Sequence, residues 1–168
     1  MVNRTALVRS TFLVLALACA CRHADLLAPV DGLGVVSGEW DGAAWRGYGY
    51  AVVSGEGILL VGHRPDPHYY YDEFVRAWFP FTGVGTYGVP DSTGALWKIV
   101  GGDAGEMPFA AGELRVTFAD AGPRTLRGTL SLDAASRGWH FRLGTFDVPV
   151  YSSWALVPNV PGRPVVSP

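Results

Sequence analysis

The stretch that decides the fold is ELRVTFADAGPRTLRGTLSLD, residues 113–133, in which apolar and polar residues alternate on both sides of a Gly-Pro pair. One face of each run is apolar: Leu114, Val116 and Phe118 in Glu113–Asp120, then Leu126, Leu130 and Leu132 in Thr125–Asp133. A period of two is typical of half-buried strands. Because Gly122-Pro123 lies between the two runs, we expect them to form an antiparallel hairpin.

The next run toward the C-terminus, Gly138–Val150, alternates in two phases. Its first apolar set is Trp139, Phe141 and Leu143, and its second is Phe146, Val148 and Val150. One extra residue in a strand reverses the face on which later side chains lie. The sequence therefore predicts a β-bulge near Gly144-Thr145.

Upstream of the central stretch, Asp41-Gly42 is a strong signal for a two-residue hairpin turn between Val36–Trp40 and Ala44–Arg46. Four further apolar runs also favour strands: Tyr48–Ser54, Gly57–Gly62, Phe74–Phe79 and Ala95–Val100. No helical period of useful length interrupts them. We expect one all-β domain at residues 36–154, a mostly antiparallel sandwich or barrel of about eight strands.

Composition agrees with a single small β-domain. The 168 residues are 49% hydrophobic and only 17% charged, and 22 Gly and 12 Pro supply many turns. Removing Met1–Ala18 takes away Arg4 and Arg9 and no acidic residue, which leaves 11 basic and 15 acidic residues and a net charge of −4. The basic residues are scattered, so the chain is not expected to bind nucleic acid.

The N-terminus has the layout of an export signal. Arg4 and Arg9 are followed by the apolar stretch TFLVLALA, Thr11–Ala18, and then by small residues. This stretch is less than half of the roughly 20 residues that a membrane-spanning helix needs. We therefore expect residues 1–18 to be a cleaved signal peptide.

Two cysteines follow the signal directly, at Cys19 and Cys21. A cysteine after small residues in this place resembles the lipobox of bacterial lipoproteins, in which the new N-terminal cysteine is acylated. We expect lipidation at Cys19, with Cys21 as the alternative, and ordinary secretion with incidental cysteines as a second interpretation. Residues 19–35 would then be a tether and the proline-rich residues 155–168 a disordered tail.

The order of the short motifs resembles that of small bacterial envelope lipoproteins from a β-rich domain family of unknown function. The matching pieces, spread over about Val36–Val150, are Asp41-Gly42 followed by Trp45, Gly85-Thr86-Tyr87, Gly128-Thr129-Leu130-Ser131-Leu132, and Gly144-Thr145-Phe146. The resemblance implies the all-β fold and an envelope location, and it implies no activity.

One segment gathers chemically active side chains. His63, Asp66 and His68 lie close together in sequence and could bind a divalent metal ion, although their spacing matches no established zinc pattern. The prolines between them also suit a solvated loop.

The same segment continues into Tyr69, Tyr70 and Tyr71, with Trp78 further along. Exposed aromatic side chains of this kind could bind a sugar ring or a partner protein, whereas buried ones would only fill the core.

These features favour a lipid-anchored, extracytoplasmic envelope protein with a non-catalytic binding or structural role. Its expected partners are the membrane, through the acyl anchor, and an envelope protein, a glycan or a small ligand. No Gly-x-Ser-x-Gly turn or Ser-x-x-Lys pair is present, and no cofactor is expected. The alternatives are a barrel that carries a small apolar ligand and a metal-dependent extracytoplasmic hydrolase around His63 and His68.

Overall fold

The computed structural model describes residues 30–65, 72–88, 93–100, 103–120, 122, 124–134 and 138–160. Over these residues the chain forms nine strands and one short 3₁₀ turn: β1 (Gly34–Trp40), β2 (Ala43–Ser54), β3 (Gly57–Arg64), β4 (Glu73–Phe79), β5 (Gly85–Gly88), β6 (Thr93–Val100), β7 (Asp103–Ala119), β8 (Thr125–Ala134), β9 (His140–Tyr151) and η2 (Trp154–Leu156). The expected all-β, mostly antiparallel class is confirmed.

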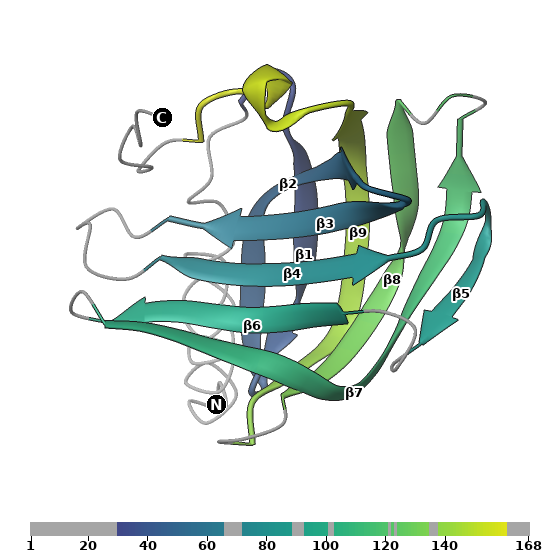
Figure 1. Ribbon diagram of the computed structural model, residues 1–168. Coiled ribbons are helices and arrows are strands. Elements are labelled where there is room, and N and C mark those ends of the chain that lie inside the picture. The colour runs from purple at the N-terminus through teal and green to yellow at the C-terminus, as the bar shows by residue number, and fades with distance from the viewer. Residues whose placement is uncertain are drawn as a thin grey trace, which may run out of the picture.

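Eight of these described strands form a closed circuit of antiparallel pairings, in the order β1–β2–β3–β4–β6–β7–β8–β9 and back to β1. β5 adds to the second half of β7, and the ends of β2 and β9 meet in a short parallel pairing. The sheet therefore curls on itself into a barrel-like shape (Figure 1).

The barrel is flattened because two long strands bend from one side to the other. In Figure 1, β3, β4 and β6 cross the front, whereas β1, β9 and β8 run behind them at a steep angle. The first half of β7 pairs with β6 and its second half with β8 and β5. Likewise, β2 pairs first with β1 and then with β3.

Among the side chains that the structure describes, the inner faces of the strands contribute to one interior cluster of aliphatic and aromatic residues. Trp45, Phe141 and Phe79 are its largest fully buried members. Glycines make room for these rings: a Cβ on Gly47 would lie 2.6 Å from the Trp45 ring, and one on Gly128 would lie 2.5 Å from the Phe146 ring. Close packing of this kind is the main source of stability in a domain with no cysteine beyond Cys21.

The expected hairpin pairs β7 with β8, and Leu126, Leu130 and Leu132 are buried as the alternation indicated. Phe118 was expected on the inner face and is 40% exposed instead. A register shift between Val116 and Phe118 reverses the face at this point.

β9 contains the bulge that its two phases indicated, one position earlier than expected. The register of β8 against β9 shifts here, because Leu130 pairs with Gly144 and Leu132 pairs with Phe141. Within this stretch of β9, Leu143 has a φ of 49° and is 74% exposed. Leu143 is therefore the looped-out residue, and its expected inward position was wrong. Phe146 and Val148 are buried after the bulge, as expected.

A second apolar cluster covers the outer face of β2, β3 and β4. It contains Tyr48, Tyr50 and Phe74 from the strands and Val160 from the C-terminal segment, with Val30 and Leu33 packed beside them. Residues 157–160, which the sequence assigned to the tail, thus pack against the barrel, and β1 begins at Gly34 inside the expected tether.

Candidate functional site

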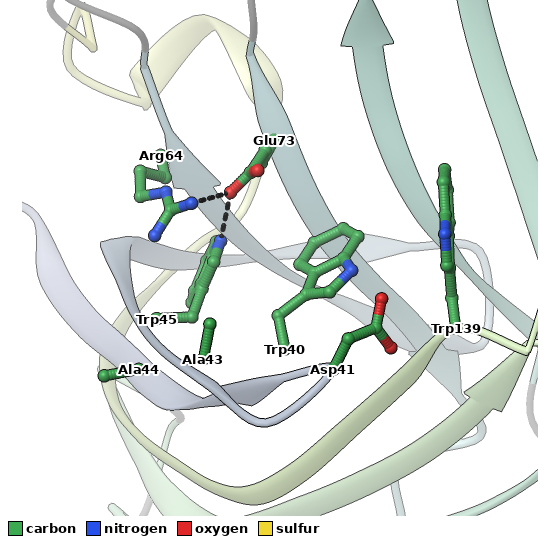
Figure 2. A pocket seen from close by; sticks show the side chains of 8 residues that line it. All are labelled: Trp40, Asp41, Ala43, Ala44, Trp45, Arg64, Glu73 and Trp139. Atoms are coloured by element: carbon green, nitrogen blue, oxygen red, sulfur yellow. Dashed lines mark hydrogen bonds and ion pairs between the residues drawn. The ribbon is translucent and has the colours of Figure 1, made fainter.

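A pocket of about 280 Å³ opens at the end of the barrel where the β1–β2 hairpin meets the start of β9 (Figure 2). Its walls come from four separate parts of the described chain: Trp40, Asp41, Ala43, Ala44 and Trp45 from the hairpin, Arg64 from β3, Glu73 from β4, and Trp139 before β9. Pockets that bind small molecules combine aromatic walls with a few polar groups in this way.

Three tryptophans form the aromatic part of the pocket. Trp40 lies between Trp45 and Trp139, with ring centroids 6.3 Å and 5.9 Å away (Figure 2). Trp45 and Trp40 are buried, and Trp45 also packs edge-on against Phe141 at 5.4 Å. Trp139 is only partly buried, so its ring is the one that a ligand could cover.

The polar part of the pocket is a buried carboxylate. Glu73 is 7% exposed. Its Oε2 accepts a 2.9 Å hydrogen bond from Trp45 Nε1 and forms an ion pair with Arg64 Nη2. The Arg64 guanidinium also lies 5.8 Å from the centroid of the Trp45 ring. Because the two charges neutralise each other, this part of the pocket offers hydrogen-bonding groups without a net charge.

The hairpin turn fixes the rim. Asp41 and Gly42 have φ values of 51° and 80°, as a two-residue hairpin turn requires. Asp41 Oδ1 accepts a 2.7 Å hydrogen bond from the backbone N–H of His140, and Asp41 N–H donates back to the His140 carbonyl at 3.0 Å. These two bonds hold Trp139, the residue before His140, against the hairpin.

A second charged group lies next to this rim on β8 and β9. Asp133 Oδ1 is 2.7 Å from His140 Nδ1 and also pairs with Arg142. The hydrogen bond from His140 and the nearby Arg142 guanidinium lower the pKa of Asp133 below its usual range.

Of the three residues considered as metal ligands, His63 is the one that lies within the described residues. It is 1% exposed on the outer face of β3, where its ring stacks on Phe74 at 4.2 Å and its Nε2 lies 3.3 Å from Asp72 Oδ2. Asp66 and His68 lie outside the described residues. Within the described part of the chain, no three His, Cys, Asp or Glu side chains are grouped to hold a metal ion.

Of the expected aromatic platform, only Trp78 is described, because Tyr69, Tyr70 and Tyr71 lie outside the described residues. Trp78 is half-buried on the outer face of β4, and its Nε1 donates a 3.1 Å hydrogen bond to the Ser54 carbonyl. Its ring covers Gly57, where a Cβ would lie 2.6 Å from it. In this position Trp78 packs between strands.

The expected lipidation sites, Cys19 and Cys21, also lie outside the described residues. In the part of the chain that the structure describes, no helix is both long and apolar enough to cross a bilayer.

The pocket residues are far apart in sequence and form no motif, but the parity of the strands contains a signal. Glu73 alternates with Val75, Ala77 and Phe79, so it occupies a core-facing position of β4. Arg64 does the same on β3, in phase with Ile58 and Leu60. Two opposite charges at core-facing positions of adjacent strands indicate an ion pair at a barrel end, and of the two only Glu73 is buried.

No family model, no curated protein and no solved structure matches this chain.

Proposed function

We propose that this chain is a lipid-anchored, extracytoplasmic envelope protein whose barrel is a non-catalytic binding module, with the tryptophan pocket as its recognition site. The observation that carries the proposal is the pocket itself: three indoles in contact with one another, beside a buried Glu73 carboxylate that is neutralised by the half-exposed Arg64, at one end of the barrel. Buried polar groups beside partly exposed aromatic surface are characteristic of recognition sites.

A neutral sugar ring fits this chemistry best. The C–H face of a pyranose can pack on the Trp139 ring. Its hydroxyls can then form hydrogen bonds with the carboxylate oxygens of Glu73 and the guanidinium nitrogens of Arg64. An aromatic cage around a quaternary ammonium ion fits less well, because the three indoles pack on one another and leave no space between them. The proposed ligand class is therefore a glycan of the cell envelope.

The carrier-barrel alternative has less support from the described residues. The inward side chains of β1, β2, β8 and β9 pack against one another in one cluster, where a lipid-carrying barrel would leave a lumen. The pocket that the structure does contain has a charged pair in its wall.

The binding proposal is tested by titrating the protein with mono- and disaccharides of neutral hexoses and N-acetylhexosamines while tryptophan fluorescence is recorded. Binding of at least one sugar in the wild type, and its loss in Trp139→Ala, is the expected result. Trp78→Phe is the matched control, because Trp78 lies away from the pocket and should leave the affinity unchanged. A panel that gives no response, or equal effects of the two substitutions, would refute the pocket.

The anchor is tested separately by growing cells on an alkyne fatty acid and tagging the labelled proteins. The wild-type chain should carry the label, and Cys19→Ser should remove it while Cys21→Ser retains it. Label lost only in Cys21→Ser would move the anchor to that residue. No label in the wild type, or label kept when both cysteines are replaced, would refute lipidation.

A further inference from the structure

The end of the barrel opposite the pocket has an exposed apolar tip. Residues 152–156 are all exposed, and within η2 the side chains of Trp154 and Leu156 are 45% and 59% exposed. Val53, at the end of β2, is 43% exposed next to Val52, which pairs with Tyr151. Figure 1 shows η2, in yellow, at the extremity of the molecule.

The described chain enters the domain beside this tip. The Tyr151 hydroxyl donates a hydrogen bond to the Gly32 carbonyl, and burial raises the pKa of Tyr151, which keeps the phenol protonated as a donor. A Cβ on Gly32 would lie 2.9 Å from Pro158, and Val30 packs in the same cluster as Val157. The N-terminal segment and η2 are thus joined at one end of the barrel.

From this junction, β1 runs the length of the barrel to the pocket. It begins at Gly34, two residues after Gly32, and ends at Trp40, which lines the pocket. Seven residues of strand separate the two ends by roughly 20 Å. The apolar tip is therefore on the side where the described chain begins, and the pocket is on the far side.

We infer that the η2 tip rests on the bilayer surface, with Trp154 and Leu156 in the interfacial region, so that the pocket faces away from the membrane that holds the anchor. This inference rests on the proposed lipid anchor. Val30 is eleven positions after Cys19, a separation of at most about 40 Å, so the tip can touch the bilayer that holds the anchor. Tryptophan is enriched at membrane interfaces because one part of its ring is apolar and its N–H is polar.

The charges at this end indicate how the contact is made. Asp31, Glu56 and Asp120 are exposed acidic side chains there, and Arg124 is an exposed basic one. This excess of acidic groups repels anionic headgroups. Insertion of apolar side chains should therefore drive the contact, and the contact should become stronger when salt screens the repulsion.

The test uses the protein purified with its acyl chains and reconstituted into phosphatidylethanolamine–phosphatidylglycerol vesicles that contain a lipid brominated near the headgroup. Bromine quenches only tryptophans at the interface. Wild-type fluorescence should fall, and Trp154→Phe should remove about half or more of that quenching, because Trp154 is the most exposed of the tryptophans whose burial the structure describes. Trp139→Phe, at the opposite end, should keep the quenching.

A second pair of variants measures the contact without changing a tryptophan. Leu156→Ser should weaken the quenching, whereas Leu143→Ser, which removes a more exposed leucine from β9, should not. Quenching that is unaffected by Trp154→Phe and Leu156→Ser would overturn the inference.

Failure of the anchor is recognised independently, because the mass of the purified protein would show no acyl chains. In that case the unanchored protein is titrated with the same vesicles. Quenching that depends on Trp154 would support the contact of the η2 tip with the bilayer. The absence of such quenching would overturn it.

Discussion

Trp45 Nε1 donates a 2.9 Å hydrogen bond to Glu73 Oε2 and so joins the first half of β2 to the start of β4 inside the barrel. Both side chains are almost fully buried, at 2% and 7% exposure. The same carboxylate oxygen pairs with Arg64, so one polar group connects three strands at the base of the pocket.

Glu73→Ala should lower the free energy of unfolding by about 2–4 kcal/mol, because it leaves the Trp45 N–H without its acceptor in a buried site and separates Arg64 from its charge partner. Glu73→Gln keeps an oxygen for the indole and should lower it by only about 1 kcal/mol. Urea denaturation gives both values. Glu39→Ala, at an exposed position of β1, is the control and should have almost no effect. Equal losses in the two Glu73 variants would contradict the role of the hydrogen bond.

Gly128→Ala should destabilise the barrel by about 1–3 kcal/mol, because the new Cβ would lie 1.9 Å from the Arg115 carbonyl and 2.5 Å from the Phe146 ring. Gly85→Ala is a matched control: both glycines pair with Val116, from opposite sides of β7, but the Gly85 position has no heavy atom within 4 Å. The thermal midpoint should fall in the first variant and stay constant in the second. A fall in both would show that backbone freedom, and not ring packing, decides the effect.

Asp133 should make the domain sensitive to acid. The hydrogen bond from His140 and the Arg142 charge lower the folded-state pKa below the ordinary 3.8, so the folded state favours the ionised carboxylate. This stabilisation is present above pH 3.8 and is lost as the pH falls through the folded-state pKa. Asp133→Asn should lower the free energy of unfolding at pH 7 by no more than about 1 kcal/mol, because solvent screens charges near the surface.

The measurement for Asp133 is a series of urea midpoints from pH 7 downward. The difference between wild type and Asp133→Asn should shrink once the pH is below 3.8. A difference that is the same at every pH would show that the substitution acts through packing and not through charge.

Asp41→Ala should lower the free energy of unfolding by about 1–2 kcal/mol, because it removes the acceptor of the His140 N–H and places alanine at a φ of 51°. It should also weaken sugar binding, because the same bonds hold Trp139 at the rim. Asp31→Ala, in the exposed turn at the other end of the barrel, should change neither property. Urea denaturation and the fluorescence titration are carried out on the same samples. Unchanged sugar binding in Asp41→Ala would show that the Asp41 bonds do not position Trp139 for binding.

The fold could be predicted wherever a strand keeps one phase of alternation. Leu126, Leu130 and Leu132 show this, and so does the Asp41-Gly42 turn, whose positive φ values its residue types indicate. Phe118 and Leu143 were misplaced because bulges depend on the register between neighbouring strands, which a single strand's sequence does not contain. Whether the strands form a sandwich or a barrel depends on the β1–β9 pairing, which joins the first described strand to the last.

The candidate site was harder to predict than the fold. Trp40 and Trp139 meet only because the pairing of β1 with β9 closes the circuit, and tryptophans in a small β-domain are ordinarily read as core residues. Glu73 belongs to no recognisable motif, and its core-facing parity on β4 is the informative feature.

The most direct test of the central claim is an NMR titration of the indole N–H signals with the sugar that gives the strongest fluorescence response, or with each sugar of the panel in turn. We expect the Trp40 and Trp139 signals to shift together and saturably, while those of Trp78 and Trp154, outside the pocket, stay in place. Signals that never move, or that move equally for all of these tryptophans, would contradict a binding site at this end of the barrel.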